Sequence, residues 1–210
     1  MNRILVSGLL AATTLTLAAV EPPRNTLGIR ASYQPSWVTS RGVSTSVRPG
    51  FSAGIVDQIR LSAKVPFYIE TGLEFASKGY KLRGYDDSST TINYLKLPVG
   101  IMYHIPVGND ITIQPHVGLY YAYGVWGRLH FGSNDPFDVF GQKSLSRNDF
   151  GYNIGAAVTY RNIYLGVSYE AGLIDIAKYD PIYTGQTAML GYTKLKNISV
   201  SITLGYNFNF

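Results

Sequence analysis

The sequence predicts an all-β fold in which eight antiparallel strands close into an up-and-down transmembrane β-barrel. Three observations support this prediction: apolar and polar residues alternate with period two in one segment after another, the links between these segments alternate in length, and the polar positions hold mostly Gly, Ser, Thr and Asn. The chain has 210 residues, of which 46% are hydrophobic and 13% aromatic, and this composition excludes intrinsic disorder and suits one domain.

The N-terminal segment has the features of a secretory signal peptide. Arg3 provides a positive charge, residues 4–20 are apolar or small, and the run ends just before Pro22. An uncleaved anchor helix is the alternative, but the run is short for a membrane span and helix-breaking prolines follow it. We therefore expect residues 1–20 to be a signal peptide and residues 21–210 to be the exported outer-membrane β-barrel domain.

The first two strands are expected at residues 27–33 and 49–60. Every second residue of the first is apolar, namely Leu27, Ile29, Ala31 and Tyr33. Because successive side chains of a strand point to opposite faces, such a segment has one apolar face and one polar face. In the second strand the apolar positions run into Asp57, and we expect a β-bulge there that shifts the register.

The three central strands are expected at residues 67–75, 95–103 and 111–123, where apolar residues again occupy alternate positions. Pro98 and Pro115 interrupt two of these strands. A proline has no amide hydrogen to donate to a ladder hydrogen bond, so we expect a bulge or an unpaired edge at each.

The last three strands are expected at residues 150–160, 163–173 and 198–210. The final strand shows the pattern most clearly, with apolar residues at Ile198, Val200, Ile202, Leu204, Tyr206, Phe208 and Phe210. A strand of this length crosses a bilayer when it is tilted, whereas a helix would spread the apolar residues around its axis.

The links between the expected strands alternate in length. Short links fall at residues 61–65, 106–110 and 161–162, and long links fall at residues 38–48, 80–91, 125–148 and 176–194. Tight turns at one rim and long loops at the other are typical of outer-membrane barrels, and they place both termini at the short-turn rim. Closure of the barrel also pairs every backbone group and leaves no open edge.

A soluble barrel of the lipocalin type is the rival architecture, with its apolar face inside and its polar face in water. A water-facing surface is usually about a quarter to a third charged, whereas the polar positions here are mostly small and uncharged. Tyr and Phe near the strand ends also match the aromatic girdles of a membrane barrel. We therefore expect the protein in the outer membrane of a Gram-negative bacterium, with outer-membrane lipid and lipopolysaccharide as its surroundings.

The sequence offers little support for catalysis, cofactors or nucleic-acid binding. The chain has no cysteine, and its basic residues form no run. No Gly-x-Ser-x-Gly motif, metal-spaced histidine pair or phosphate-binding loop lies near His104 or His130. His116 and Ser168 are expected to point inward at similar heights, but an intervening strand is expected to keep them apart. We expect a protein that is not an enzyme and that binds no metal or cofactor.

Two sets of motifs resemble known outer-membrane proteins. The closing segment Leu204-Gly205-Tyr206-Asn207-Phe208-Asn209-Phe210 resembles the signal read by bacterial barrel-assembly machinery, which implies that Tyr206, Phe208 and Phe210 contact this machinery during biogenesis. Residues 67–79, 94–99 and 164–173 resemble the PorT-like outer-membrane β-barrel family common in Bacteroidetes. Most members of that family have no assigned activity, and one branch is similar to a protein needed by a type IX secretion system.

Six charged residues are expected in the lumen, namely Arg30, Glu70, Glu74, Lys96, Arg161 and Glu170. An unpaired charge in a water-poor lumen is costly, so these groups are expected to pair, with Glu74 facing Lys96 on the neighbouring strand. We interpret them as a charge network that plugs the barrel. A selective proton or ion path is the alternative, while an open porin is excluded because eight strands enclose little more than side chains.

Aromatic residues in the long links are candidates for binding: Trp126, Phe131, Phe137, Phe140 and Tyr183. They could dock a protein partner, fold over the barrel mouth or lie among lipopolysaccharide sugars. The sequence thus predicts a plugged outer-membrane barrel with a structural or surface-binding role. The alternatives are an accessory component of an outer-membrane secretion or assembly complex and a lipid-modifying enzyme.

Overall fold

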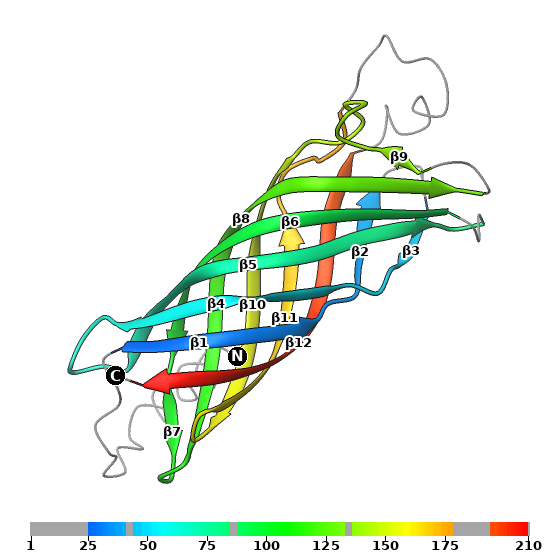
Figure 1. Cartoon of the computed structure of the whole chain (residues 1–210). Helices are drawn as coiled ribbons and strands as arrows, with labels where there is room; N and C mark the ends of the chain where they lie inside the picture. Colours follow the sequence, from blue (N-terminus) through cyan, green and yellow to red (C-terminus); the bar gives the residue numbers. More distant parts are fainter. Residues whose placement is uncertain (1–24, 41–43, 85–87, 133–135, 179–193, 210) are drawn as a thin grey trace, which may run out of the picture.

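The computed structural model describes residues 25–40, 44–84, 88–132, 136–178 and 194–209, so the expected signal peptide lies outside the described residues. In the described part, one antiparallel sheet is rolled into a barrel (Figure 1). Eight strands form its closed ring: β1 (Asn25–Tyr33), β4 (Phe51–Arg60), β5 (Phe67–Leu82), β6 (Ser88–Tyr103), β8 (Ile111–Phe131), β10 (Asn148–Tyr160), β11 (Ile163–Gly172) and β12 (Leu195–Asn209). Because β1 pairs with both β4 and β12, the ring is complete and the predicted fold is confirmed.

The alternation in the sequence corresponds to the two faces of this barrel. Leu204 on β12 and Leu165 on β11 are register partners, and both point outward with 60% and 54% of their surface exposed. Their polar neighbours Ser201 and Gly166 are buried in the interior. The apolar half of each strand is therefore the outer surface, and the small polar half lines the lumen. No helix in the described residues is long and apolar enough to cross a membrane.

Four short strands complete the sheet, and prolines explain two of them. They are β2 (Ser36–Ser40), β3 (Thr45–Val47), β7 (Ile105–Val107) and β9 (Phe137–Asp138). Strand β2 follows β1 after Pro35 and pairs with β12, and β3 precedes β4 before Pro49 and pairs with β5. Each proline lacks an amide hydrogen and interrupts what would otherwise be one long strand.

The strands β5, β6 and β8 extend further toward the long-loop rim than the sequence predicted (Figure 1). The links at 80–91 and 125–148, expected as long loops, therefore consist in part of strand. The reason is that the pattern of apolar and polar positions reverses there, so that apolar side chains point into the barrel and charged side chains point outward. Tyr80, Ile92 and Leu129 point inward and are buried or partly buried, whereas Lys81 and Arg128 point outward. A search for apolar residues on the outer face misses such segments.

The bulge expected in residues 49–60 is absent, and that prediction was wrong. Strand β4 keeps one register along its whole length with both β1 and β5, and Asp57 stays in the ladder opposite Leu27. The register also does not shift at Pro98 or Pro115. The shift between β6 and β8 lies instead at Asn93 and Tyr94, where β8 contains Val125 as an extra residue.

The upper part of β8 extends beyond the start of β10, which leaves one of its edges without a ring neighbour. The segment 137–147 covers this edge: β9 pairs with β8, and the Arg147 guanidinium donates hydrogen bonds to the carbonyls of Gly124 and Val125 at 2.7 and 3.0 Å. Covering a strand edge removes a site at which other chains could pair.

Candidate functional site

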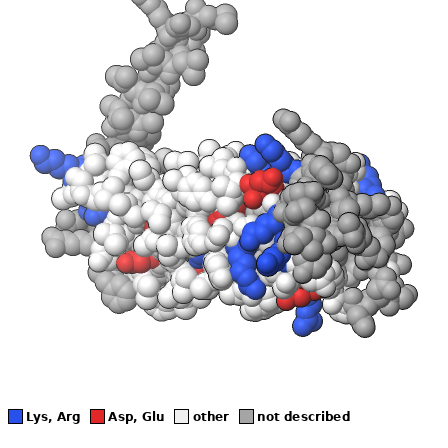
Figure 2. Space-filling model, turned by 90° about the horizontal axis from the view of Figure 1, so that it is seen from above, with Lys and Arg blue, Asp and Glu red and all other residues white. Residues whose placement is uncertain are grey.

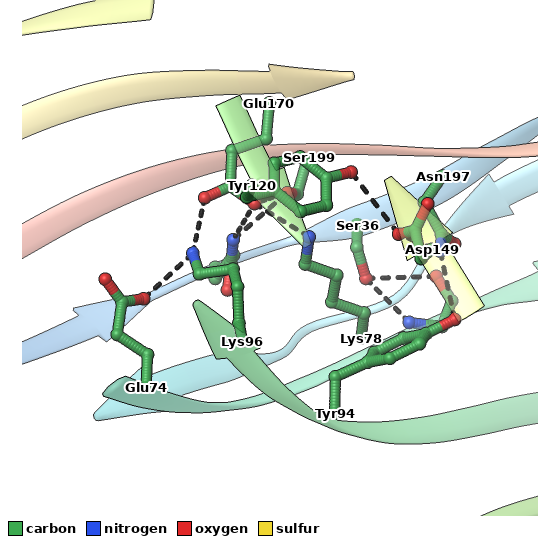
Figure 3. Close-up of polar contacts among 12 residues, drawn as sticks. Ser36, Glu74, Lys78, Tyr94, Lys96, Tyr120, Asp149, Glu170, Asn197 and Ser199 are labelled. Carbon is green, nitrogen blue, oxygen red and sulfur yellow. Dashed lines mark hydrogen bonds and ion pairs between the residues drawn. The ribbon is translucent and has the colours of Figure 1, made fainter. Parts of the chain in front are cut away.

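The charged groups of the lumen converge on Glu170, which projects from β11. Its carboxylate accepts an ion pair from Lys78 Nζ on β5 at 2.7 Å and one from Lys96 Nζ on β6 at 2.6 Å (Figure 3). Lys96 also contacts Glu74 at 2.8 Å, and Gln34 Nε2 donates to Glu170 at 3.0 Å. Because β5 and β11 lie on opposite sides of the eight-stranded ring, this charge network spans the lumen from wall to wall.

A second polar cluster adjoins the charge network on the side of the long loops (Figure 3). Asp149 accepts hydrogen bonds from Asn197 Nδ2 at 2.9 Å and from the Tyr120 hydroxyl at 3.3 Å. Asn197 also donates to the Tyr94 hydroxyl, and the ammonium of Lys78 lies 4.7 Å from the centre of the Tyr120 ring. All five side chains are buried. Since hydrogen bonds connect buried polar groups here, the cluster fills the lumen and holds its walls together.

Five of the six charged residues expected in the lumen line it, but Arg161 does not. Arg161 occupies the two-residue turn between β10 and β11 with φ of 54°, and its exposed side chain contacts Asp110 at 3.3 Å. The alternation of a strand does not extend into its turn. Sequence reasoning also missed Lys78, because the strand was expected to end at residue 75. Continuing the even-numbered positions of Glu70 and Glu74 would have identified it.

A cavity of about 50 Å³ lies in the lumen beside the charge network, lined by Arg30, Tyr164, His116 and Ser168 among other residues. The Arg30 guanidinium lies 3.8 Å from the centre of the Tyr164 ring. A cavity of this size holds a few water molecules.

His116 and Ser168 make a contact that the sequence analysis excluded. The distance from His116 Nε2 to Ser168 Oγ is 3.0 Å, although β10 lies between their strands. Gly155 on β10 explains this contact, because a Cβ at that position would lie 2.7 Å from each of the two atoms. The missing side chain lets the histidine and the serine meet across the intervening strand.

This histidine–serine pair lacks the third member of a hydrolase site. His116 Nδ1 faces the carbonyl of Gln114 on its own strand at 3.4 Å. Among the described residues no carboxylate is hydrogen-bonded to this nitrogen, and Glu170 is engaged by two lysines. A serine nucleophile needs an oriented base and an oxyanion site as well as a nearby histidine. In the structure the pair lines the lumen cavity.

At the turn end, side chains that pack around His104 fill the lumen. His104 directly follows the last residue of β6. The imidazole stacks on the Tyr68 ring with 3.8 Å between ring centres and lies 3.2 Å from Gln114 Nε2. Burial, with a smaller contribution from the positive charge of Arg60, lowers the pKa of His104 to about 4. The side chain is therefore neutral at pH 7 and packs as an uncharged ring.

A hydrophobic cluster closes the opposite end of the lumen. Its members come from the strands and from the loop segments above them: Val38, Tyr80, Ile92, Tyr94, Tyr120, Ala122, Val139, Phe140, Leu145, Ile176 and Leu195. Among the aromatic residues proposed for binding, Phe140 is buried in this cluster and Phe137 packs against it. These two rings thus fold over the barrel mouth.

The remaining candidates from the sequence lie elsewhere. Trp126 points outward from β8 with 53% of its surface exposed, and its ring centre is 5.4 Å from that of Phe75. The backbone of Phe131 ends β8, and Tyr183 lies outside the described residues. In the proposed assembly signal, Tyr206 and Phe208 point outward with their rings 4.9 Å apart, while Phe210 lies outside the described residues.

Comparison with known proteins relates the barrel to outer-membrane proteins. A family model described as "Outer membrane protein beta-barrel domain" matches residues 25–178. Similar solved structures include OprG from Pseudomonas aeruginosa (14% identity, 90% of this chain and 98% of that chain covered, TM-score 0.54) and a major outer membrane protein from Thermus thermophilus (13% identity, 88% and 99% covered, TM-score 0.52). No curated protein matches the sequence. The narrower resemblance to PorT-like barrels stays a prediction.

Proposed function

Because the chain belongs to the outer membrane protein beta-barrel domain family and is an outer-membrane protein, we propose that it is a closed structural barrel whose described loop segments form an ordered surface outside the cell. It neither conducts solutes nor catalyses a reaction. The observation that carries this proposal is the charge network of Glu74, Lys96, Glu170 and Lys78, which crosses the lumen from β5 and β6 to β11.

Closure at three levels supports the absence of conduction. The hydrophobic cluster lies at the loop end, the charge network lies in the middle, and the packed ring of His104 lies at the turn end. An ion that crossed the barrel would have to separate buried ion pairs and displace packed rings. Both steps are costly in a narrow lumen of eight strands.

The order of the loop segments supports a role at the cell surface. Backbone hydrogen bonds connect the segments above the barrel, from Ser146 N to Ile176 O at 2.7 Å, from Lys178 N to Ser144 O at 3.0 Å and from Ile176 N to Leu195 O at 2.9 Å. A surface that is ordered before it binds loses less conformational entropy on binding. A partner in a secretion or assembly complex would contact the barrel at this surface.

Recording ion current across a planar lipid bilayer tests this proposal. We expect the purified full-length protein to insert without producing discrete conductance steps, because the lumen is closed at three levels. An outer-membrane porin inserted under the same conditions serves as the positive control. Heat-dependent migration on a gel verifies that the barrel is folded. Reproducible conductance steps from the folded wild-type protein would contradict the closed-barrel proposal.

A further inference from the structure

We propose that the outer wall of β4 and β5 binds a second copy of this chain within the membrane, through the polar pair of Asp57 and Thr71. Asp57 points outward, because its neighbours Val56 and Gln58 point into the lumen with 2% and 0% of their surface exposed. Among the described residues, Asp57 is the only charged residue that points outward between the aromatic residues at the two ends of the wall. An ionisable side chain in this setting is costly, and membrane proteins rarely keep one without a function.

The strand ladder places this polar pair inside the membrane-spanning wall. Asp57 on β4 is the register partner of Thr71 on β5. Thr71 lies four residues from Phe67 on the turn side and four residues from Phe75 on the loop side, and each of these rings packs against another aromatic ring. Four residues of strand span about 13 Å, and aromatic girdles mark the two interfaces of a membrane barrel. The pair therefore lies at the depth of acyl chains, with Asp57 slightly nearer the turn side because the strands are tilted.

The described part of the chain provides no partner for the Asp57 carboxyl group. Asp57 takes part in none of the ion pairs and in no hydrogen bond of its side chain among these residues. The outward residues around the pair are apolar and between 40% and 54% exposed, namely Leu27, Ile55, Ile59, Leu73 and Val99. Over most of its area the described wall in the space-filling view is uncharged (Figure 2). A polar group without a partner in hydrocarbon costs free energy, and a second chain can remove this cost.

Thr71 offers the group that complements a carboxylic acid. Its hydroxyl donates a hydrogen bond to the Pro98 carbonyl at 3.0 Å, which leaves the lone pairs of Oγ1 as acceptors. A carboxylic acid group can donate to this oxygen while the bond to Pro98 is kept. Within one chain, Asp57 and Thr71 face each other across the ladder but are not hydrogen-bonded to each other. The pair therefore presents one donor and one acceptor side by side on the outer wall.

A second copy of the chain fits this pair because the pair is complementary to itself. Copies in one membrane have the same orientation, so a two-fold axis between them runs along the membrane normal. When this axis passes between the two side chains, Asp57 of one copy faces Thr71 of the other, and the same contact occurs twice. Adjacent strands are about 4.8 Å apart, so both hydrogen bonds form at one small contact. The apolar residues around the pair then pack against each other across the axis.

Energy transfer between donor-labelled and acceptor-labelled copies in lipid vesicles tests the proposal. The full-length protein carries the label at Asn109→Cys in the exposed turn before β8, and dilution with lipid gives the dissociation constant of the dimer. Asp57→Leu and Thr71→Val are each expected to weaken the dimer at least about tenfold, because each substitution removes both symmetric hydrogen bonds. The control Tyr152→Phe removes an outward hydroxyl from β10, on the opposite side of the ring, and is expected to dimerise as wild type does.

Thiol cross-linking with a short bismaleimide locates the contact face. We expect cross-linked dimers from Leu73→Cys, beside the polar pair on β5, and none from Ile154→Cys on β10. A wild type that stays monomeric at high protein density, unchanged affinity in either Asp57→Leu or Thr71→Val, an equal loss in Tyr152→Phe, or cross-linking at Ile154→Cys in place of Leu73→Cys would each overturn the proposal. The dimer requires only the outer-membrane location, so its failure would leave the closed-barrel proposal intact.

Discussion

Glu170→Ala is expected to lower the free energy of unfolding by about 3–5 kcal/mol, because it removes one partner of a buried ion pair and leaves the other without compensation. Glu170 holds both Lys78 and Lys96, and the side chains of these two lysines are only 1% and 4% exposed. After the substitution Lys96 retains Glu74, but Lys78 has no other ion pair among the described residues. The loss therefore exceeds that of a surface salt bridge, which contributes about 0–1 kcal/mol.

Urea unfolding in lipid vesicles, followed by tryptophan fluorescence and by migration on a gel, measures this loss. As a control, a combined variant replaces the whole charge network with apolar residues: Glu74→Leu, Lys78→Met, Lys96→Met and Glu170→Leu. We expect this variant to be far more stable than Glu170→Ala, because it leaves neither Lys78 nor Lys96 as a buried cation without its carboxylate. A loss below about 1 kcal/mol for Glu170→Ala would show that the network does not stabilise the barrel.

Leu204→Arg is expected to lower the free energy of unfolding by about 2–4 kcal/mol, the range for a basic residue at the bilayer midplane on the lipid face of a barrel. Leu204 lies within β12, pairs with Ala31 and Leu165, and has 60% of its surface exposed on the outer wall. An arginine there would face acyl chains. In a water-exposed position the same substitution would change the free energy of unfolding little.

The same unfolding measurement on Leu27→Arg is the matched control. Leu27 also points outward but pairs with Phe208 close to the turn rim, where the side chain can reach the interface. The expected loss at this position is about 0–1 kcal/mol. Equal losses at the two positions would mean that depth in the membrane does not determine the cost, and a negligible loss at Leu204 would contradict its contact with lipid.

The membrane-spanning part of the fold could be predicted from the sequence because one physical rule governs it. Where the outside is hydrocarbon and the inside is polar, the two faces of each strand differ, as at Leu204 and Ser201. Beyond the membrane this rule no longer holds. On β5 the outward residue is Lys81 and the inward one is Tyr80, so the same strand continues with the opposite pattern.

The lumen could be predicted in part. Facing positions indicated the pair of Glu74 and Lys96, which the structure places 2.8 Å apart. The contact between His116 and Ser168 required knowledge of which residue lies between them in space. Gly155 provides the room, but a glycine in a strand does not by itself indicate which side chains will meet over it.

The orientation of the strand faces is tested most directly by single-cysteine labelling along β12, which is straightforward because the chain has no cysteine. Each variant is labelled with an environment-sensitive fluorophore and placed in vesicles that contain phospholipids brominated on their acyl chains. We predict strong quenching for labels at Ile202 and Leu204 and weak quenching for labels at Ser201 and Thr203. Strong quenching at Ser201 and Thr203 with weak quenching at Leu204 would contradict the account.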